Sequence, residues 1–159
     1  MDNQQERFLN KTPQRLYVKA IKMTISTEIK DLITIFEMAN LEPAKTGLTF
    51  GHIYISTKES SHNCRIKYFK NLREQTQVVI VSIPDLIITE DTLLDSIDNK
   101  TRKKIVMFAK KNSKKLELFW NDGQFWSDDR VEKFKKSLKL TKQDLKDSKD
   151  IDLVWKKGI

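Results

Sequence analysis

The sequence DNKTRKKIVMFAKKNSKKLELFWNDG, from Asp98 to Gly123, has the clearest structural pattern in this chain. Its main apolar residues recur at the spacing of one helix face: Ile105, Phe108, Ala109, Leu116, Phe119 and Trp120. Arg102 and Asn112 interrupt that stripe. Asp98 is a good N-cap, because its carboxylate can accept hydrogen bonds from the open N–H groups of a first turn. Gly123 can take the left-handed conformation that often ends a helix, so we predict one long amphipathic helix.

The same stretch holds the net charge of the whole chain. The 159 residues include 30 Lys and Arg against 22 Asp and Glu, a formal net charge of +8. Eight of the basic residues and none of the acidic ones fall between Asn99 and Leu116, which leaves 22 of each elsewhere. At helical spacing seven lysines share one arc with Met107, opposite the apolar stripe. We call these seven the lysine face: Lys100, Lys103, Lys104, Lys110, Lys111, Lys114 and Lys115.

Two interpretations of the lysine face stay open. Clustered lysines can bind nucleic acid without sequence specificity by releasing counterions from phosphates, and they can also bind an acidic protein. The other interpretation is a solvated helix surface in a lysine-rich chain, since Lys outnumbers Arg 24 to 6 and Arg is the better residue for bidentate contacts. If the face binds, Lys103, Lys110 and Lys114 should matter most, because they lie on one flank.

Composition excludes several classes of protein. Hydrophobic residues at 38% and charged residues at 33% are near the globular range. No apolar run approaches the roughly 20 residues of a membrane span, so we expect no membrane partner. The polar N-terminus lacks the apolar stretch of a secretory signal. Cys64 is the only cysteine, which rules out an internal disulfide and a cysteine-rich zinc module. We therefore expect a cytoplasmic protein.

Strand and helix signals precede the lysine-rich segment. Residues 16–25 are rich in strand formers, and Ser26 or Thr27 could then cap a helix that runs to Asn40. Glu42-Pro43 and Gly47 predict a loop. Three strand candidates follow with short connections, which favours antiparallel pairing: Thr49–Ser56, Asn63–Phe69 and Gln77–Ile83.

The remaining segments predict short elements. Leu86-Ile87-Ile88 is a further short strand or the approach to the long helix, and Asp91–Ile97 adds a helical turn. A helix should begin after Ser127 and another near Thr141. We predict an α+β fold: a small antiparallel sheet of a strand, a helix and a three-stranded meander, packed on one face by the long basic helix and C-terminal helices. We expect residues 1–12 to be a flexible N-terminus, 13–140 a single domain and 141–159 a charged C-terminal segment.

Three side chains in the predicted meander could carry chemistry. His62 and Cys64 are two residues apart and could begin a metal site, but zinc needs three or four ligands, and parity places His52 on the other face. A Cys–His nucleophile pair lacks an orienting third residue. The structural alternative is that Cys64 is a small buried hydrophobe. We predict no catalytic set, no metal site and no cofactor.

Strand alternation separates the two faces of the meander. We expect one apolar face, with Ile55 near Cys64 and Ile53 near Ile66: Ile53, Ile55, Cys64, Ile66 and Tyr68. The other face would hold His52, Tyr54, Arg65 and Lys67. Rings and cations together resemble the stacking platforms that bind nucleic acid, although a plain solvated sheet face is the alternative.

Aromatic residues cluster near the C-terminal end of the chain. Phe125 and Trp126 lie in a turn, and Trp155 lies close to the end. They predict either a hydrophobic corner between helices or exposed anchors for a protein partner.

Residues 50 to 120 resemble a family of small bacterial proteins of unknown function. In that family a strand precedes a Pro-Pro-His-x-His-Val-like segment, a second strand and a helix with a Lys/Arg-Asn…Leu…Trp pattern. The matching stretches are Ile53-Tyr54-Ile55-Ser56, Ser61-His62-Asn63-Cys64-Arg65-Ile66 and Lys110-Lys111-Asn112…Leu116…Trp120. Ser60 and Ser61 stand at the two prolines and Cys64 at the second histidine. The resemblance implies this order of elements and a toxin–antitoxin-like gene pair.

These observations lead to one main hypothesis and two alternatives. The main hypothesis is a small binding protein that contacts nucleic acid or an acidic protein through its lysine-rich helix. The first alternative is a protein-interaction module of a toxin–antitoxin or immunity pair. The second is a metal-assisted hydrolase or nuclease-like toxin that uses His52, His62 and Cys64.

Overall fold

The computed structural model describes residues 38–58, 62–71 and 77–157. The chain divides into the units Met1–Ile35 and Phe36–Ile159, and every described residue belongs to the second. The strand expected at 16–25 and most of the helix expected after it lie outside the described residues.

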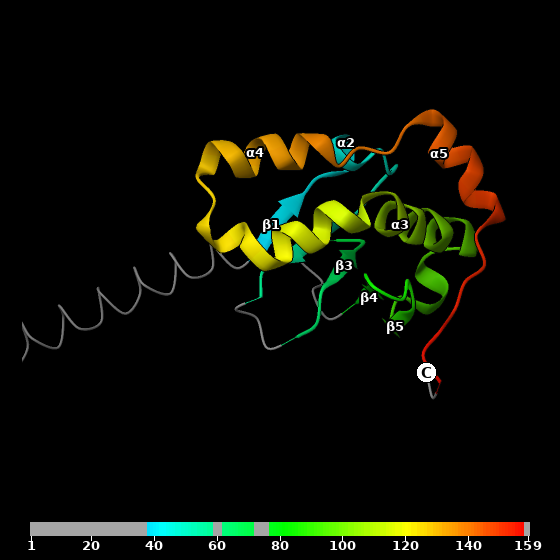
Figure 1. Cartoon of the computed structure of the whole chain (residues 1–159). Coiled ribbons are helices and arrows are strands. Elements are labelled where there is room, and N and C mark those ends of the chain that lie inside the picture. The colour runs from blue at the N-terminus through cyan, green and yellow to red at the C-terminus, as the bar shows by residue number, and fades with distance from the viewer. Residues whose placement is uncertain (1–37, 59–61, 72–76, 158–159) are drawn as a thin grey trace, which may run out of the picture. The chain divides into compact units, whose positions relative to one another are not determined.

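The described unit is built on a five-stranded antiparallel meander, with each strand paired to the next in the chain (Figure 1). The strands are β1 (Met38–Leu41), β2 (His52–Ser56), β3 (Arg65–Phe69), β4 (Val78–Ser82) and β5 (Ile88–Asp91). The α+β fold class is confirmed, and the three predicted central strands are β2, β3 and β4. The sheet has five strands because β1 and β5 extend the meander at its two edges.

Strand β1 corrects one expectation. Residues Met38–Asn40 continue a helical pattern in the sequence, yet they form a strand whose four residues pair with β2. The pairing places Leu41 beside Ile53, and both side chains are fully buried. Cross-strand hydrogen bonds and this burial outweigh the local periodicity, which is a weak determinant by itself.

The register of β2 and β3 also differs from the expectation. Ile55 pairs with Ile66, and Ile53 pairs with Tyr68. Each partner lies two residues further along β3 than expected. A shift of two residues keeps every side chain on its own face. The predicted apolar face is therefore confirmed even though its pairing was wrong, and Cys64 is buried with it.

A glycine permits the sharp entry into β2. After the one-turn helix α2 (Pro43–Thr46), the chain reaches Gly51, whose φ of +83° is in the left-handed region. A Cβ atom at Gly51 would come within 2.3 Å of the ring of Tyr68. The hydroxyl of Tyr68 donates to the carbonyl of Phe50 at 3.2 Å. Only glycine lets the backbone lie this close to the ring.

Helices cover one face of the sheet (Figure 1). After the 3₁₀ turn η1 (Leu94–Ser96) come α3 (Asn99–Asp122), η2 (Gly123–Phe125), α4 (Asp128–Ser137), α5 (Lys142–Asp147) and η3 (Ser148–Asp150). The Asp98 N-cap is confirmed, since its Oδ1 accepts from the Thr101 N–H at 2.7 Å. No helix in the described part of the chain is both long and apolar enough to cross a membrane.

The expected left-handed end of α3 is wrong. Gly123 has a φ of −57° and leads directly into η2. Its role is steric, because an added Cβ would lie 2.7 Å from the ring of Phe119. Phe119 stacks on Phe134 with ring centroids 4.7 Å apart, so this close approach joins α3 to α4.

The last residues complete the sheet edge. The Ile88 N–H donates to the Val154 carbonyl at 2.8 Å, and the Lys156 N–H donates to the Ile88 carbonyl at 2.9 Å. Trp155 thus forms a parallel bridge with Ile88 beside β5. Capping an edge strand in this way removes unpaired backbone groups.

Candidate anion-binding surface

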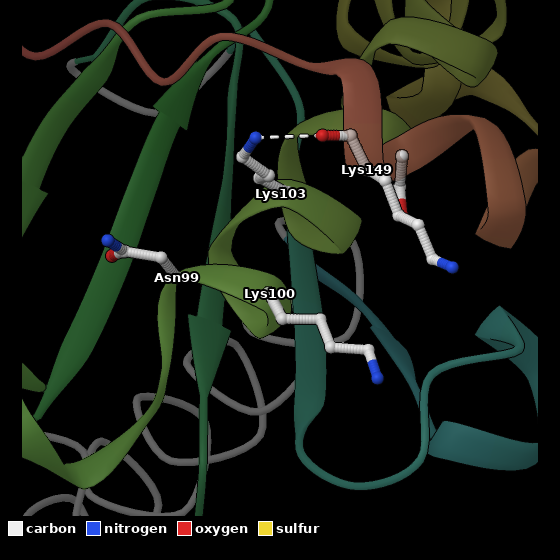
Figure 2. A pocket seen from close by; sticks show the side chains of 5 residues that line it. Asn99, Lys100, Lys103 and Lys149 are labelled. Atoms are coloured by element: carbon white, nitrogen blue, oxygen red, sulfur yellow. Dashed lines mark hydrogen bonds between the residues drawn. The ribbon is translucent and has the colours of Figure 1, made fainter.

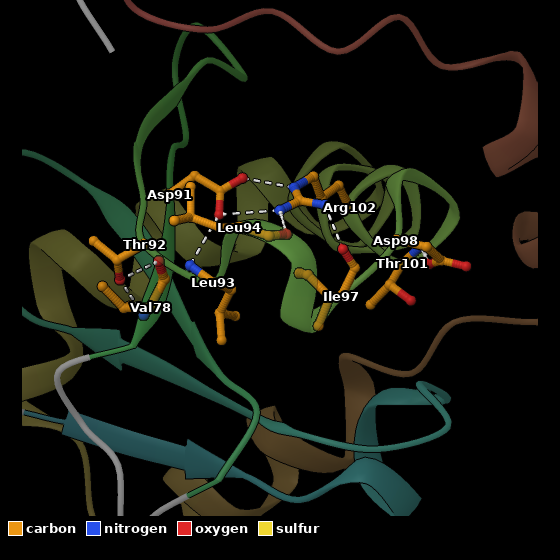
Figure 3. Close-up of polar contacts among 9 residues, drawn as sticks. All are labelled: Val78, Asp91, Thr92, Leu93, Leu94, Ile97, Asp98, Thr101 and Arg102. Carbon is orange, nitrogen blue, oxygen red and sulfur yellow. Dashed lines mark hydrogen bonds and ion pairs between the residues drawn. The ribbon is translucent and has the colours of Figure 1, made fainter.

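Arg102 is one of the eight basic residues of the long helix. Its guanidinium group makes hydrogen bonds to neighbouring parts of the protein (Figure 3). Its Nε donates to Asp91 Oδ2 at 2.6 Å, and both side chains are 8% exposed. Nη1 donates to the Ile97 carbonyl at 2.6 Å and Nη2 to the Leu94 carbonyl at 2.6 Å. Arg102 therefore fixes the start of α3 against β5 and η1, and its charge is not available to a partner.

The lysine face divides into two sets. Three of its lysines contact residues 137–149. The Nζ of Lys103 donates to the Lys149 carbonyl at 2.8 Å, and that of Lys111 donates to Asp144 Oδ1 at 2.9 Å. The Nζ of Lys115 donates to the Ser137 carbonyl at 2.8 Å. Within the described ranges the other four make no hydrogen bond or ion pair. We call these the free lysines: Lys100, Lys104, Lys110 and Lys114.

The engaged lysines follow one row of α3, at positions 103, 111 and 115, with Met107 between them. Residues i and i+4 are neighbours on a helix surface, so one docked segment can cover the whole row. Met107 is only 9% exposed, although it was expected among solvated lysines. Its burial shows that the predicted seven-lysine surface is partly an internal interface.

The segment that covers this row is the C-terminal arm, residues 137–151, which includes α5 and η3. Leu138, Leu140 and Ile151 belong to the main core, and the Leu140 N–H donates to the Thr46 carbonyl at 2.9 Å. Thr141 and Asp144 form a capping box at the start of α5. The arm is therefore an integral part of the described fold.

Asp144 joins the arm electrostatically to α3. The hydrogen bond from Lys111, together with those from Thr141, lowers the pKa of the Asp144 carboxyl from 3.8 to about 2. The carboxylate is thus ionised at neutral pH, where it both caps α5 and neutralises one lysine of the face.

The arm also supplies cations of its own. Lys142, Lys146 and Lys149 are exposed, and they lie on elements that pack against α3. Asp147 and Asp150 offset part of this charge, and Asp147 accepts a hydrogen bond from Gln143. Sequence reasoning missed this contribution, because charges separated by more than 30 residues share a surface only through the docking of the arm.

A small basic pocket lies where the arm meets the first turn of α3 (Figure 2). Its volume is about 240 Å³. Five residues line it: Asn99, Lys100, Lys103, Ser148 and Lys149. Figure 2 shows Lys103 reaching the Lys149 carbonyl, which joins the two sides of the pocket.

The other predicted binding residues lie on the second face of the sheet. Tyr54, Arg65 and Lys67 are half-buried there, whereas α3 packs with the apolar face formed by Ile53 and its neighbours. The ten residues expected to bind nucleic acid thus belong to two surfaces on opposite sides of the sheet. One rigid partner surface cannot contact both sets at once.

The second face is less polar than the sequence suggested. Phe69, Val78 and Ile80 form a small buried cluster there, against which Tyr54 packs edge-on to Phe69 with centroids 5.1 Å apart. The sequence signal was available, since Val78–Val81 is continuously apolar, as in strands buried on both faces.

The cations of the second face are partly desolvated. Burial lowers the pKa of both Arg65 and Lys67, and for Lys67 the neighbouring charge of Arg65 lowers it further. The carboxylate of Glu90 opposes both shifts. Arg65 Nε and His52 Nδ1 are buried without a hydrogen-bond partner among the described residues.

The histidines and the cysteine do not gather into a site. Cys64 is buried in the core, where burial raises the pKa of its thiol to about 12, and the carboxylate of Glu117 adds to the shift. His62 is exposed, and the charge of Arg65 lowers its pKa. His52 lies on the second face of the sheet. In the described part of the chain no three His, Cys, Asp or Glu residues are arranged to hold a metal ion.

The three predicted partner-interface aromatics have different environments. Trp126 is 7% exposed and packs edge-on against both Phe119 and Phe134, with the Arg130 guanidinium 4.1 Å from its ring centroid. This is the hydrophobic corner. Phe125 is 79% exposed and Trp155 is 40% exposed, so these two remain available for contact.

Comparison with known proteins identifies no relative. No family model matches the chain, and neither a curated protein nor a solved structure matches it significantly. The resemblance of residues 50 to 120 to a bacterial family therefore stays a prediction from the quoted motifs.

Proposed function

We propose that this protein binds nucleic acid without sequence specificity, through the free lysines of α3 and the neighbouring lysines of the C-terminal arm. The observation that carries the proposal is that Lys100, Lys104, Lys110 and Lys114 make no hydrogen bond or ion pair among the described residues. Helix α3 has no acidic residue before Glu117, and the N-cap Asp98 interacts electrostatically with Lys100.

The physical basis is counterion release. Lysines that neutralise backbone phosphates displace condensed cations, and the affinity then falls steeply with salt. Like charges on one helix face repel one another. A bound polyanion would reduce this repulsion. The docked arm already reduces part of it, because Asp144 forms an ion pair with Lys111.

The salt dependence of binding tests the proposal. The four free lysines, with one phosphate contact each, contribute roughly −3.6 to the slope of log K against log salt for duplex DNA, and each contact from an arm lysine makes the slope steeper. The variant Lys110→Gln/Lys114→Gln should reduce this slope by about 2. Lys103 is left unchanged, because its contact with the arm is structural.

A matched control removes the same charge elsewhere. Lys58→Gln/Lys156→Gln replaces two exposed lysines outside α3 and should leave the slope nearly unchanged. Absence of binding to duplex DNA and RNA at about 50 mM salt, where electrostatic association is strong, would refute the proposal. Binding to polyglutamate but not to nucleic acid would instead assign the surface to an acidic protein.

A further inference from the structure

We infer that residues 152–156 form a sheet edge on which a second copy of this chain docks, strand against strand, to make a symmetric dimer. The inference goes beyond the proposed function and does not rest on it. It gives a partner to the edge that the last described residues add beside β5.

The backbone of this edge has groups that point away from β5. In the parallel bridge, the Val154 carbonyl and the Lys156 N–H both bond to Ile88. Backbone groups alternate in direction along an extended strand, so those of Leu153 and Trp155 point outward. Neither of these two residues makes a backbone hydrogen bond within the described part of the chain. The residues that cover β5 therefore create a new edge one strand further out.

The side chains at the centre of this edge are apolar and partly exposed. Val154 is 51% exposed and Trp155 is 40% exposed, whereas Leu153 packs against the main core. Natural edges are commonly protected by charges, prolines or bulges. Residues 152–156 contain no proline, and their charges lie only at the two ends. The centre of the edge is thus suited to pairing with another strand.

The charges at the two ends favour a second copy in antiparallel orientation. Asp152 and Lys156 are exposed, and neither makes an ion pair with a described residue. They cannot pair with each other, because four residues of extended chain span roughly 13 Å. When two identical edges pair antiparallel, each Asp152 can lie opposite the partner's Lys156, so both charges are matched twice in one dimer.

The outward backbone groups fit the same register. Hydrogen-bonded pairs need residues whose N–H and C=O both point outward, so Leu153 can pair with the partner's Trp155. This pairing sets Val154 opposite the partner's Val154 on the two-fold axis, and it sets Asp152 opposite the partner's Lys156. Backbone and charge therefore agree on one self-complementary contact.

One alternative register satisfies the backbone but not the charges. It places Trp155 opposite the partner's Trp155, which sets Lys156 against the apolar Val154 of the partner subunit. Asp152 then has no cation opposite it. The two opposite-charge pairs thus favour the register with Val154 on the axis.

The contact is short, so we expect a weak dimer. A standard interface buries about 800 Å² on each partner, and a single short strand edge buries less. We expect a Kd of roughly 0.1 mM. In the dilute protein of a nucleic-acid titration this dimer dissociates, so Lys156→Gln keeps its use as a control there, and the two proposals can fail separately.

Sedimentation equilibrium of the full chain, at up to about 1 mM protein, tests the dimer. Asp152→Lys should weaken association roughly tenfold, because it places like charges opposite each other, and Lys156→Asp should do the same. The double variant Asp152→Lys/Lys156→Asp restores both opposite-charge pairs and should recover most of the lost affinity. Asp122→Lys is the matched control, because it makes the same charge change at an exposed residue of α3 and should leave association unchanged.

Cysteine cross-linking tests the register. In a non-hydrogen-bonded antiparallel pair the Cα atoms are about 4.5 Å apart, which a disulfide can span. Mild oxidation should therefore give a covalent dimer with Val154→Cys. Lys156→Cys is the matched control and should not cross-link, because its two copies would lie roughly 13 Å apart. The native Cys64 is buried and does not compete.

Three results would overturn the inference. A protein that stays monomeric at every concentration would leave the edge to a strand of a different protein. A dimer that Asp152→Lys and Asp122→Lys affect equally, or that the double variant does not restore, would place the contact on another surface. Equal cross-linking of the two cysteine variants would exclude the antiparallel register.

Discussion

The buried ion pair of Arg102 and Asp91 gives the sharpest prediction for stability. Arg102→Met keeps a side chain of similar length and helix propensity but leaves the Asp91 carboxylate in a site where it is 8% exposed. The carbonyls of Leu94 and Ile97 lose their donors as well. Breaking one partner of a buried pair costs about 3–5 kcal/mol, and we expect the free energy of unfolding to fall by about 4 kcal/mol.

The double variant Asp91→Asn/Arg102→Met tests the stated cause. Asparagine removes the unpaired charge and keeps an oxygen for the Leu93 N–H, which donates to Asp91 Oδ1 at 3.2 Å. We expect the double variant to be about 1–2 kcal/mol more stable than Arg102→Met alone.

Urea unfolding at pH 7 measures these differences, with the m-value as a check that the denatured state is unchanged. Lys110→Met is the matched control, because it removes an exposed, unpaired cation from the same helix and should change stability by no more than about 0.5 kcal/mol. The reasoning is refuted if Arg102→Met stays within about 1 kcal/mol of this control, or if the double variant is no more stable than the single one.

Three further predictions concern other parts of the fold. Asp144→Asn should lower the free energy of unfolding by about 2 kcal/mol at pH 7, because the native pKa of Asp144 is depressed. The difference should shrink as the pH falls from about 5 towards 2, and urea unfolding at several pH values measures it. Gly51→Ala should cost about 3 kcal/mol, through left-handed strain and a clash with Tyr68, and a melting temperature close to wild type would contradict this. The Cys64 thiol, whose pKa is about 12, should resist a thiol reagent at pH 8 until urea unfolds the protein, and rapid labelling of the native protein would show that it is accessible.

Local patterns predicted the parts of the fold that depend on neighbouring residues. The apolar stripe and the Asp98 cap predicted α3, and strand alternation separated the buried Ile53 from the half-buried Tyr54. These succeed because helix and strand periods are properties of a short stretch, and the core selects one face of each.

Local patterns misjudged the residues whose state depends on a distant segment. Met38–Asn40 continue a helical period, but pairing with β2 makes them a strand. Met107 lies on the lysine arc by its period, but the C-terminal arm buries it. In both cases the free energy of a long-range contact exceeds the small local preference.

The sequence alone showed where the excess positive charge lies, but it did not show which of those cations are free to contact a partner. Composition and spacing alone placed the whole excess of +8 on one helix. Two distant parts of the chain decide which of those cations are free. Asp91 pairs with Arg102, and the arm accepts hydrogen bonds from Lys103 and Lys111. The pocket arises in the same way, because residues 99–103 and 148–149 meet only through tertiary packing, which no local period encodes.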